Sequence, residues 1–148
     1  MKKCFIALAT VAALLFFVSG LSAHCELPCG IYGDQGRLNE IAEDIVTIEK
    51  SVKMITELEN AKKIDYNQLV RWIDNKDQHA DKIQHIVCQY FLTQRIKFDA
   101  KNYDQKLAVL HRMLVYAMKC KQTVDPAVVE QLRKASEEFK ALYMEHEH

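Results

Sequence analysis

The fold class is decided by residues 37–63, RLNEIAEDIVTIEKSVKMITELENAKK. The apolar residues of this stretch recur at steps of three and four: Leu38, Ile41, Ile45, Ile48, Val52, Ile55 and Leu58. Such spacing places them on one face of a helix, and Glu and Lys fill the other faces. We therefore expect one long amphipathic helix. The preceding Gly33-Asp34-Gln35-Gly36 has the composition of a turn.

Three more helices are predicted downstream. Asp65 is a suitable N-cap for the second, and the pair Asp125-Pro126 predicts the start of the last. Composition suggests a connection at 98–102, and a third helix follows it. The apolar stripes of these helices are, in order, Leu69, Ile73, Ala80, Ile83, Val87 and Tyr90; Tyr103, Leu107, Leu110, Leu114, Ala117 and Met118; and Val129, Leu132, Ala135, Phe139 and Leu142. The prediction is an all-α protein, a four-helix bundle with up-down-up-down topology.

Lys76 falls where the second stripe calls for an apolar residue. Either its stem packs while its ammonium group reaches water, or the helix is interrupted there.

The N-terminal segment is typical of a secretory signal. Lys2 and Lys3 precede an apolar run from Cys4 to Val18. The segment 19–23 that follows ends in a small residue, Ala23. The run is short for a membrane span, so we expect cleavage after Ala23, export, and no stable membrane span in the processed chain. The chain then divides into a cleaved segment 1–23, an irregular metal-binding hook at 24–36 and a bundle at 37–148. With 20 basic and 20 acidic residues there is no electrostatic case for nucleic acid binding.

Cleavage would make His24 the amino terminus of HCELPCGIY, residues 24–32. The His24 amine, the Cys25 amide nitrogen and the Cys25 thiolate can close two five-membered chelate rings on one ion. Cys29 can supply a fourth in-plane donor if the chain reverses, which Pro28 and Gly30 favour. This planar N2S2 set points to nickel(II) or copper(II) rather than structural zinc. The remaining His24 imidazole can approach along the axis and favours a higher oxidation state.

The hook resembles that of the nickel superoxide dismutases on His24, Cys25, Pro28, Cys29, Gly30 and Tyr32, and Gln89-Tyr90-Phe91 resembles an aromatic pair of the same family. The resemblance implies disproportionation of superoxide by Ni(II)/Ni(III) cycling, about one nickel per chain and a homohexamer. It implies that His24, Cys25 and Cys29 bind the metal and that Tyr32 lies near the open axial face. Glu40 corresponds to an acidic residue that orients the axial histidine. The basic partner of that acid is not placed, although Asn75 or Lys76 falls near its position.

Other interpretations remain open at this stage. Exported cysteines often form disulfides, here Cys25–Cys29 and Cys88–Cys120. An acidic helix face could hold a second metal, although such a face is more often simply solvated: Asp74, Asp77, Asp81 and His85. The alternative function is a non-enzymatic exported bundle, either a disulfide-stapled interaction protein or a nickel or copper carrier. Some relatives carry a short propeptide and stay cytoplasmic, which is the alternative for the compartment.

Overall fold

The computed structural model describes residues 33–145 of the 148-residue chain. Over this range the chain forms four α-helices and one π-helix, with no strand. The elements are α2 (Gly33–Glu59), α3 (Tyr66–His85), the π-helix η1 (Ile86–Arg95), α4 (Tyr103–Gln122) and α5 (Pro126–Met144). Because η1 continues directly from α3, the two act as one long rod.

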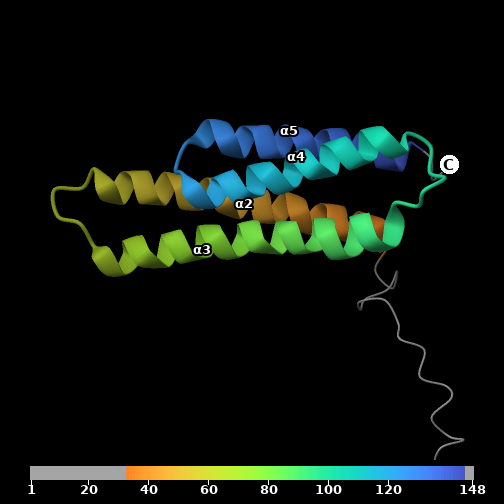
Figure 1. Ribbon diagram of the computed structural model, residues 1–148. Coiled ribbons are helices and arrows are strands. Elements are labelled where there is room, and N and C mark those ends of the chain that lie inside the picture. Colours follow the sequence, from red (N-terminus) through yellow and green to blue (C-terminus); the bar gives the residue numbers. More distant parts are fainter. Residues whose placement is uncertain (1–32, 146–148) are drawn as a thin grey trace, which may run out of the picture.

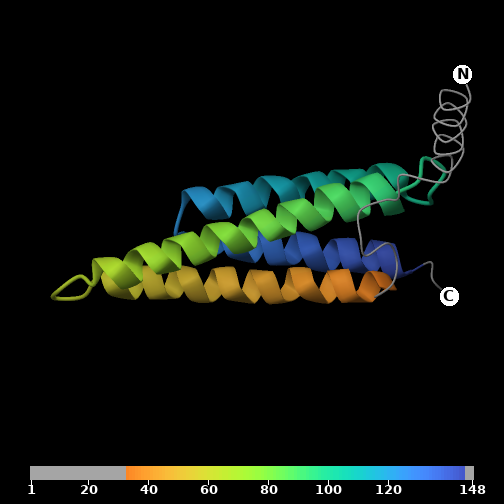
Figure 2. The ribbon, with the colours of Figure 1, turned by 90° about the horizontal axis from the view of Figure 1, so that it is seen from below.

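Each helix of the bundle packs against the next in sequence, and α5 closes the ring against α2. The connections are short, so sequential helices run in opposite directions (Figures 1 and 2). The predicted all-α four-helix bundle with up-down-up-down topology is therefore confirmed for the described residues.

The predicted helix starts at Asp65 and Asp125 are also confirmed. Asp65 Oδ1 accepts a hydrogen bond from the backbone N–H of Gln68 at 3.1 Å, and Asp125 Oδ1 accepts one from that of Ala127 at 2.9 Å. Both ends of the first helix differ from the predicted range of 37–63, since α2 begins at Gly33 and ends at Glu59. The last four residues of the hook, predicted as a turn, form the first turn of α2.

The predicted stripe of α2 supplies much of the core, together with residues of every other helix. The stripe of α3 is only partly buried: Ala80 and Ile83 are fully covered, but Ile73 is 40% exposed. Figures 1 and 2 show why, since the α2–α3 hairpin extends beyond the ends of α4 and α5. Tyr66 and Val70, on the same overhanging part of α3, are 70% and 63% exposed.

The start of α2, the end of η1 and the end of α5 all lie at the opposite end of the bundle (Figures 1 and 2). Gly33, the first described residue, lies at this end, so the residues gathered there surround the start of α2. Among residues 33–145, no helix is both long enough and apolar enough to cross a membrane.

Candidate metal centre

The predicted metal ligands His24, Cys25 and Cys29 lie outside the described residues, as do Pro28, Gly30 and Tyr32. The described part of the chain begins at the next residue, Gly33. Gly33 has a φ of +67°, and a Cβ at this position would meet no atom within 4 Å. Glycine adopts this left-handed conformation without steric cost. The chain therefore has a residue suited to a change of direction at the point where the hook meets α2.

The start of α2 is tied to the rest of the bundle through Asp34. Its Oδ1 accepts a hydrogen bond from the Tyr90 hydroxyl at 2.5 Å, and its Oδ2 accepts one from the Tyr143 hydroxyl at 2.6 Å. Arg95 Nε lies 2.9 Å from Oδ1 as an ion pair whose N–H is not aligned for a hydrogen bond. Arg95 Nη2 instead donates to the Tyr90 hydroxyl at 2.8 Å. We call these four residues the Asp34 clamp.

The charges of the clamp reinforce one another. Burial alone would raise the pKa of Asp34, but hydrogen bonds from Tyr143 and Tyr90 and the charge of Arg95 outweigh it and lower the pKa below its usual value. Burial and the hydrogen bond to Asp34 raise the pKa of Tyr90. At neutral pH, Asp34 is therefore ionised and the Tyr90 proton is directed at it. This places the Tyr90 hydroxyl in a structural hydrogen bond.

The π-helical register of η1 makes the clamp geometrically accessible. One π-turn brings residues five apart onto the same face, whereas an α-helix brings together residues three and four apart. Arg95 and Tyr90 are five apart and both reach Asp34. Side chains reinforce the same register, since Thr93 Oγ1 donates to the Cys88 carbonyl at 2.7 Å and Gln94 Nε2 to the Gln89 carbonyl at 3.0 Å. The sequence analysis did not predict this π-helix.

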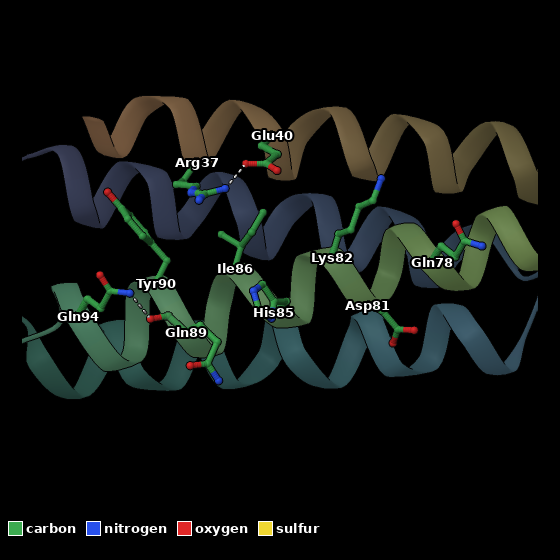
Figure 3. Close-up of a pocket in the computed structure, with 10 residues that line it drawn as sticks. All are labelled: Arg37, Glu40, Gln78, Asp81, Lys82, His85, Ile86, Gln89, Tyr90 and Gln94. Atoms are coloured by element: carbon green, nitrogen blue, oxygen red, sulfur yellow. Dashed lines mark hydrogen bonds and ion pairs between the residues drawn. The ribbon is translucent and has the colours of Figure 1, made fainter. Parts of the chain in front are cut away.

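A pocket of about 530 Å³ lies between α2 and the α3–η1 rod, next to the clamp. Glu40, the predicted support of His24, lines this pocket, and its Oε2 accepts a hydrogen bond from Arg37 Nη1 at 2.7 Å. Figure 3 shows Arg37 and Glu40 on α2, with Lys82, His85 and Tyr90 contributed by the facing rod. The Arg37 guanidinium also lies over the Tyr90 ring, 5.5 Å from its centroid. The Glu40 carboxylate therefore sits in a cationic environment beside the clamp.

The positions suggested for the basic partner of Glu40 are not supported. The Asn75 side chain donates to Ser51 Oγ at 2.9 Å, deeper in the bundle. Lys76 Nζ donates to the backbone carbonyls of Cys120 and Lys121 at 2.6 Å and 3.0 Å. The cation bonded to Glu40 is instead Arg37, from one turn earlier in the same helix.

A second polar pair lies one turn further along α2 from Glu40. Asp44 is 5% exposed, and its Oδ1 lies 2.6 Å from Nδ1 of His79 on α3. Burial raises the pKa of Asp44, and the hydrogen bond and charge of His79 only partly offset this rise. The sequence analysis missed the pair. Its signal was the position of Asp44 on the apolar face, between Ile41 and Ile48.

A second metal site on the acidic face of α3, the less favoured alternative from the sequence, is not supported. Among residues 33–145, no group of three or more His, Cys, Asp or Glu side chains could hold a metal ion. Three of the four predicted residues have polar partners instead: Asp74 with Gln78, Asp77 with Lys76, and Asp81 with Lys121. The face is a solvated one whose acids are paired.

The Cys88–Cys120 disulfide is likewise not formed, because both cysteines are free. Cys120 is buried in the core, and burial raises the pKa of its thiol to about 11. It therefore stays protonated at neutral pH and behaves as a small apolar residue.

The described residues define an all-helical bundle protein with a pocket lined by both basic and acidic side chains beside the start of α2. A family model described as nickel-containing superoxide dismutase matches residues 19–147. No curated protein and no solved structure matched the chain in the other two comparisons.

Because the match covers most of the sequence, the chain belongs to the nickel-containing superoxide dismutase family. It is an oxidoreductase that converts superoxide to dioxygen and hydrogen peroxide, and its cofactor is nickel.

Proposed function

We propose that nickel is held entirely by the first residues of the processed chain. His24 would supply its amine and imidazole, Cys25 its amide nitrogen and thiolate, and Cys29 its thiolate. These donors suit a planar, redox-active nickel ion, since thiolates and nitrogen ligands favour it over the harder cations. The observation that carries the proposal is the hook sequence at 24–32, within a family match that includes it.

When bound, nickel supplies one-electron chemistry between its divalent and trivalent states. The protein's own residues have to orient the ligands and deliver protons, because two superoxide anions take up two protons to give one dioxygen and one hydrogen peroxide. We assign Tyr32 to ordering the small anion or water beside the metal. Pro28 and Gly30 would shape the reversal of the hook between its two cysteines.

Glu40 is assigned to orienting the His24 imidazole. Arg37 Nη1 pairs with Oε2 of Glu40 at 2.7 Å, which holds the carboxylate where it lines the pocket. The second oxygen, Oε1, can then accept an N–H from the imidazole. An outer carboxylate of this kind fixes the orientation of a ligating histidine and raises its basicity. Arg37 takes the role of the basic partner for which the sequence offered Asn75 or Lys76.

The free amine is the decisive feature of this proposal, so the experiment adds one alanine before His24. The added residue converts the amine into an amide, and we expect loss of bound nickel and of dismutase activity. The matched control adds the same alanine after His148. Full nickel content and activity in the N-terminally extended protein would refute the ligand set.

Export by the secretory route is also proposed, supported by the charged and apolar pattern of residues 1–23. A cytoplasmic protein with a cleaved propeptide is the competing arrangement. N-terminal sequencing of the native protein from separated cell fractions distinguishes them. Either compartment requires a chain that begins at His24.

We further propose a homohexamer. Three large apolar side chains at helical spacing on the overhanging part of α3 are exposed: Tyr66 at 70%, Val70 at 63% and Ile73 at 40%. Exposed apolar surface of this kind is typical of protein interfaces. Analytical ultracentrifugation of the nickel-loaded protein tests the proposal, and a monomeric species at micromolar concentration would contradict it.

A further inference from the structure

We propose that Asp34 is a positioning residue for the nickel site, because the Asp34 clamp fixes the point where the hook leaves the bundle. The inference rests on the proposed hook ligands and adds residues that are not metal ligands. Asp34 follows Tyr32 by two residues, whereas its partners Tyr90 and Tyr143 are 56 and 109 residues away. The clamp therefore joins the end of the hook to η1 and to α5.

The first turn of α2 is a poor helix by sequence. The turn begins with Gly33 and ends with Gly36, and glycine is among the weakest helix formers. The same composition predicted a turn at 33–36, yet the structure has α2 starting at Gly33. Helix ends fray unless something holds them. Asp34 is 11% exposed at its side chain and bonded from two other elements, so it supplies the tie that makes this segment helical.

A fixed helix start matters for the metal because only a few residues separate Asp34 from Cys29 on one side and from Glu40 on the other. Cys29 precedes Asp34 by five residues, which span at most about 18 Å when fully extended. Glu40 follows Asp34 by six residues on the same helix, a rise of about 9 Å. Clamping Asp34 therefore sets the origin of the hook and the position of Glu40 on one rigid element. Metal ligands need positioning within about 0.5 Å, so a fraying turn between them would loosen the site.

Two variants of the mature nickel-loaded protein test this role, Asp34→Asn and Tyr143→Phe. Tyr143→Phe removes one hydroxyl and keeps the ring that packs against Phe91 and Phe139. The matched control is Asp104→Asn, which removes an exposed acid from the first turn of α4 and so reproduces the change in helix-end charge.

The main readout is the rate of nickel release to excess chelator. The second is the axial nitrogen splitting in the electron paramagnetic resonance spectrum of the oxidised protein. We expect release about three- to tenfold faster in both clamp variants, since each loses a charge-assisted contact, and a broadened splitting. Asp104→Asn should match the wild type in both measurements. Thermal unfolding of the nickel-free proteins, recorded in parallel, reports the purely structural contribution.

A clamp that only stabilises the fold would lower the melting temperature and leave the nickel-release rate and the splitting unchanged, and that result would overturn the inference. The N-terminally extended protein separates this failure from failure of the ligand set. Retention of nickel by the extended protein would reject the hook ligands. Loss of nickel there, together with wild-type release from both clamp variants, would reject the clamp alone.

Discussion

Replacing Lys76 by methionine should destabilise the protein although Lys76 is remote from the hook. Its side chain is 3% exposed, and its ammonium group makes three contacts. Nζ donates to the carbonyls of Cys120 and Lys121 at 2.6 Å and 3.0 Å and to Asp77 Oδ1 at 2.7 Å. The two carbonyls belong to the last turn of α4, which ends at Gln122. They are therefore among the terminal acceptors that the helix itself leaves without partners.

The loss of stability follows from how each partner of Lys76 can be solvated after the substitution. Asp77 is 40% exposed at its side chain, so it can turn to water at little cost. The two carbonyls lose their buried donor, and an unsatisfied buried group costs about 1–3 kcal/mol. Methionine has a similar length and relieves the burial of a charge, which recovers part of this loss. We expect a net loss of about 2–4 kcal/mol, or a melting temperature lower by about 8–16 °C in a domain of this size.

The assay is urea and thermal unfolding of the nickel-free protein, at one fixed protein concentration so that metal binding and association do not contribute. Lys53→Met is the matched control, because that side chain is 75% exposed and lies 3.8 Å from its Glu57 partner. The control should change stability by less than about 0.5 kcal/mol. If Lys76→Met were no more destabilising than Lys53→Met, the reasoning about the α4 carbonyls would be wrong.

Three further outcomes follow from the contacts described above. Gly33→Ala should cost about 1–2 kcal/mol through its φ of +67° alone, and Gly33→Asn less, because asparagine tolerates that region; equal unfolding free energies would contradict this. Stability should fall as the pH rises from about 9 through 11, because folding raises the pKa of the Cys120 thiol from 9.0 to about 11 and also raises that of Tyr90. Both groups favour folding while protonated, and with reductant present Cys120→Ala should lose less stability over that interval than the wild type. His79→Ala should cost about 2–4 kcal/mol at pH 7, where Asp44 would be a buried carboxylate without its partner, and less near pH 4, where Asp44 takes up a proton. The same cost at both pH values would argue against that pair.

The parts of the fold that were predictable from sequence are those encoded over a few neighbouring residues. The stripe from Leu38 to Ile55 fixed one face of α2, and that face is buried. Asp65 and Asp125 marked helix starts because an N-cap side chain bonds to amides only two or three residues away. The proposed hook ligands are also local, since His24 and Cys29 fall within six residues of one another, but they lie outside the described residues and stay a prediction.

The features that the sequence did not reveal depend on contacts between distant residues. Lys76 was expected to reach water or to interrupt a helix, but its partners are 44 and 45 residues away on α4. Residues 33–36 have turn composition but are helical, and Asp34 within them is held by Tyr90, Arg95 and Tyr143. Periodicity within one segment carries no information about such partners.

The contrast between neighbouring and distant residues also applies to the metal. We expect binding of the metal to depend on neighbouring residues and its placement to depend on contacts between distant ones. Donors within one short peptide can select nickel by their chemistry, whatever bundle follows them. With the proposed hook ligands, the position of nickel relative to Glu40 and the pocket should depend on the join at Gly33 and Asp34, where residues of η1 and α5 hold Asp34. Changes at Cys25 or Cys29 should therefore abolish nickel binding, whereas changes in the clamp should leave the metal bound but less rigidly held. π-Helical turns are frequent at functional sites, and here the five-residue register of η1 supplies two of the three groups that hold Asp34.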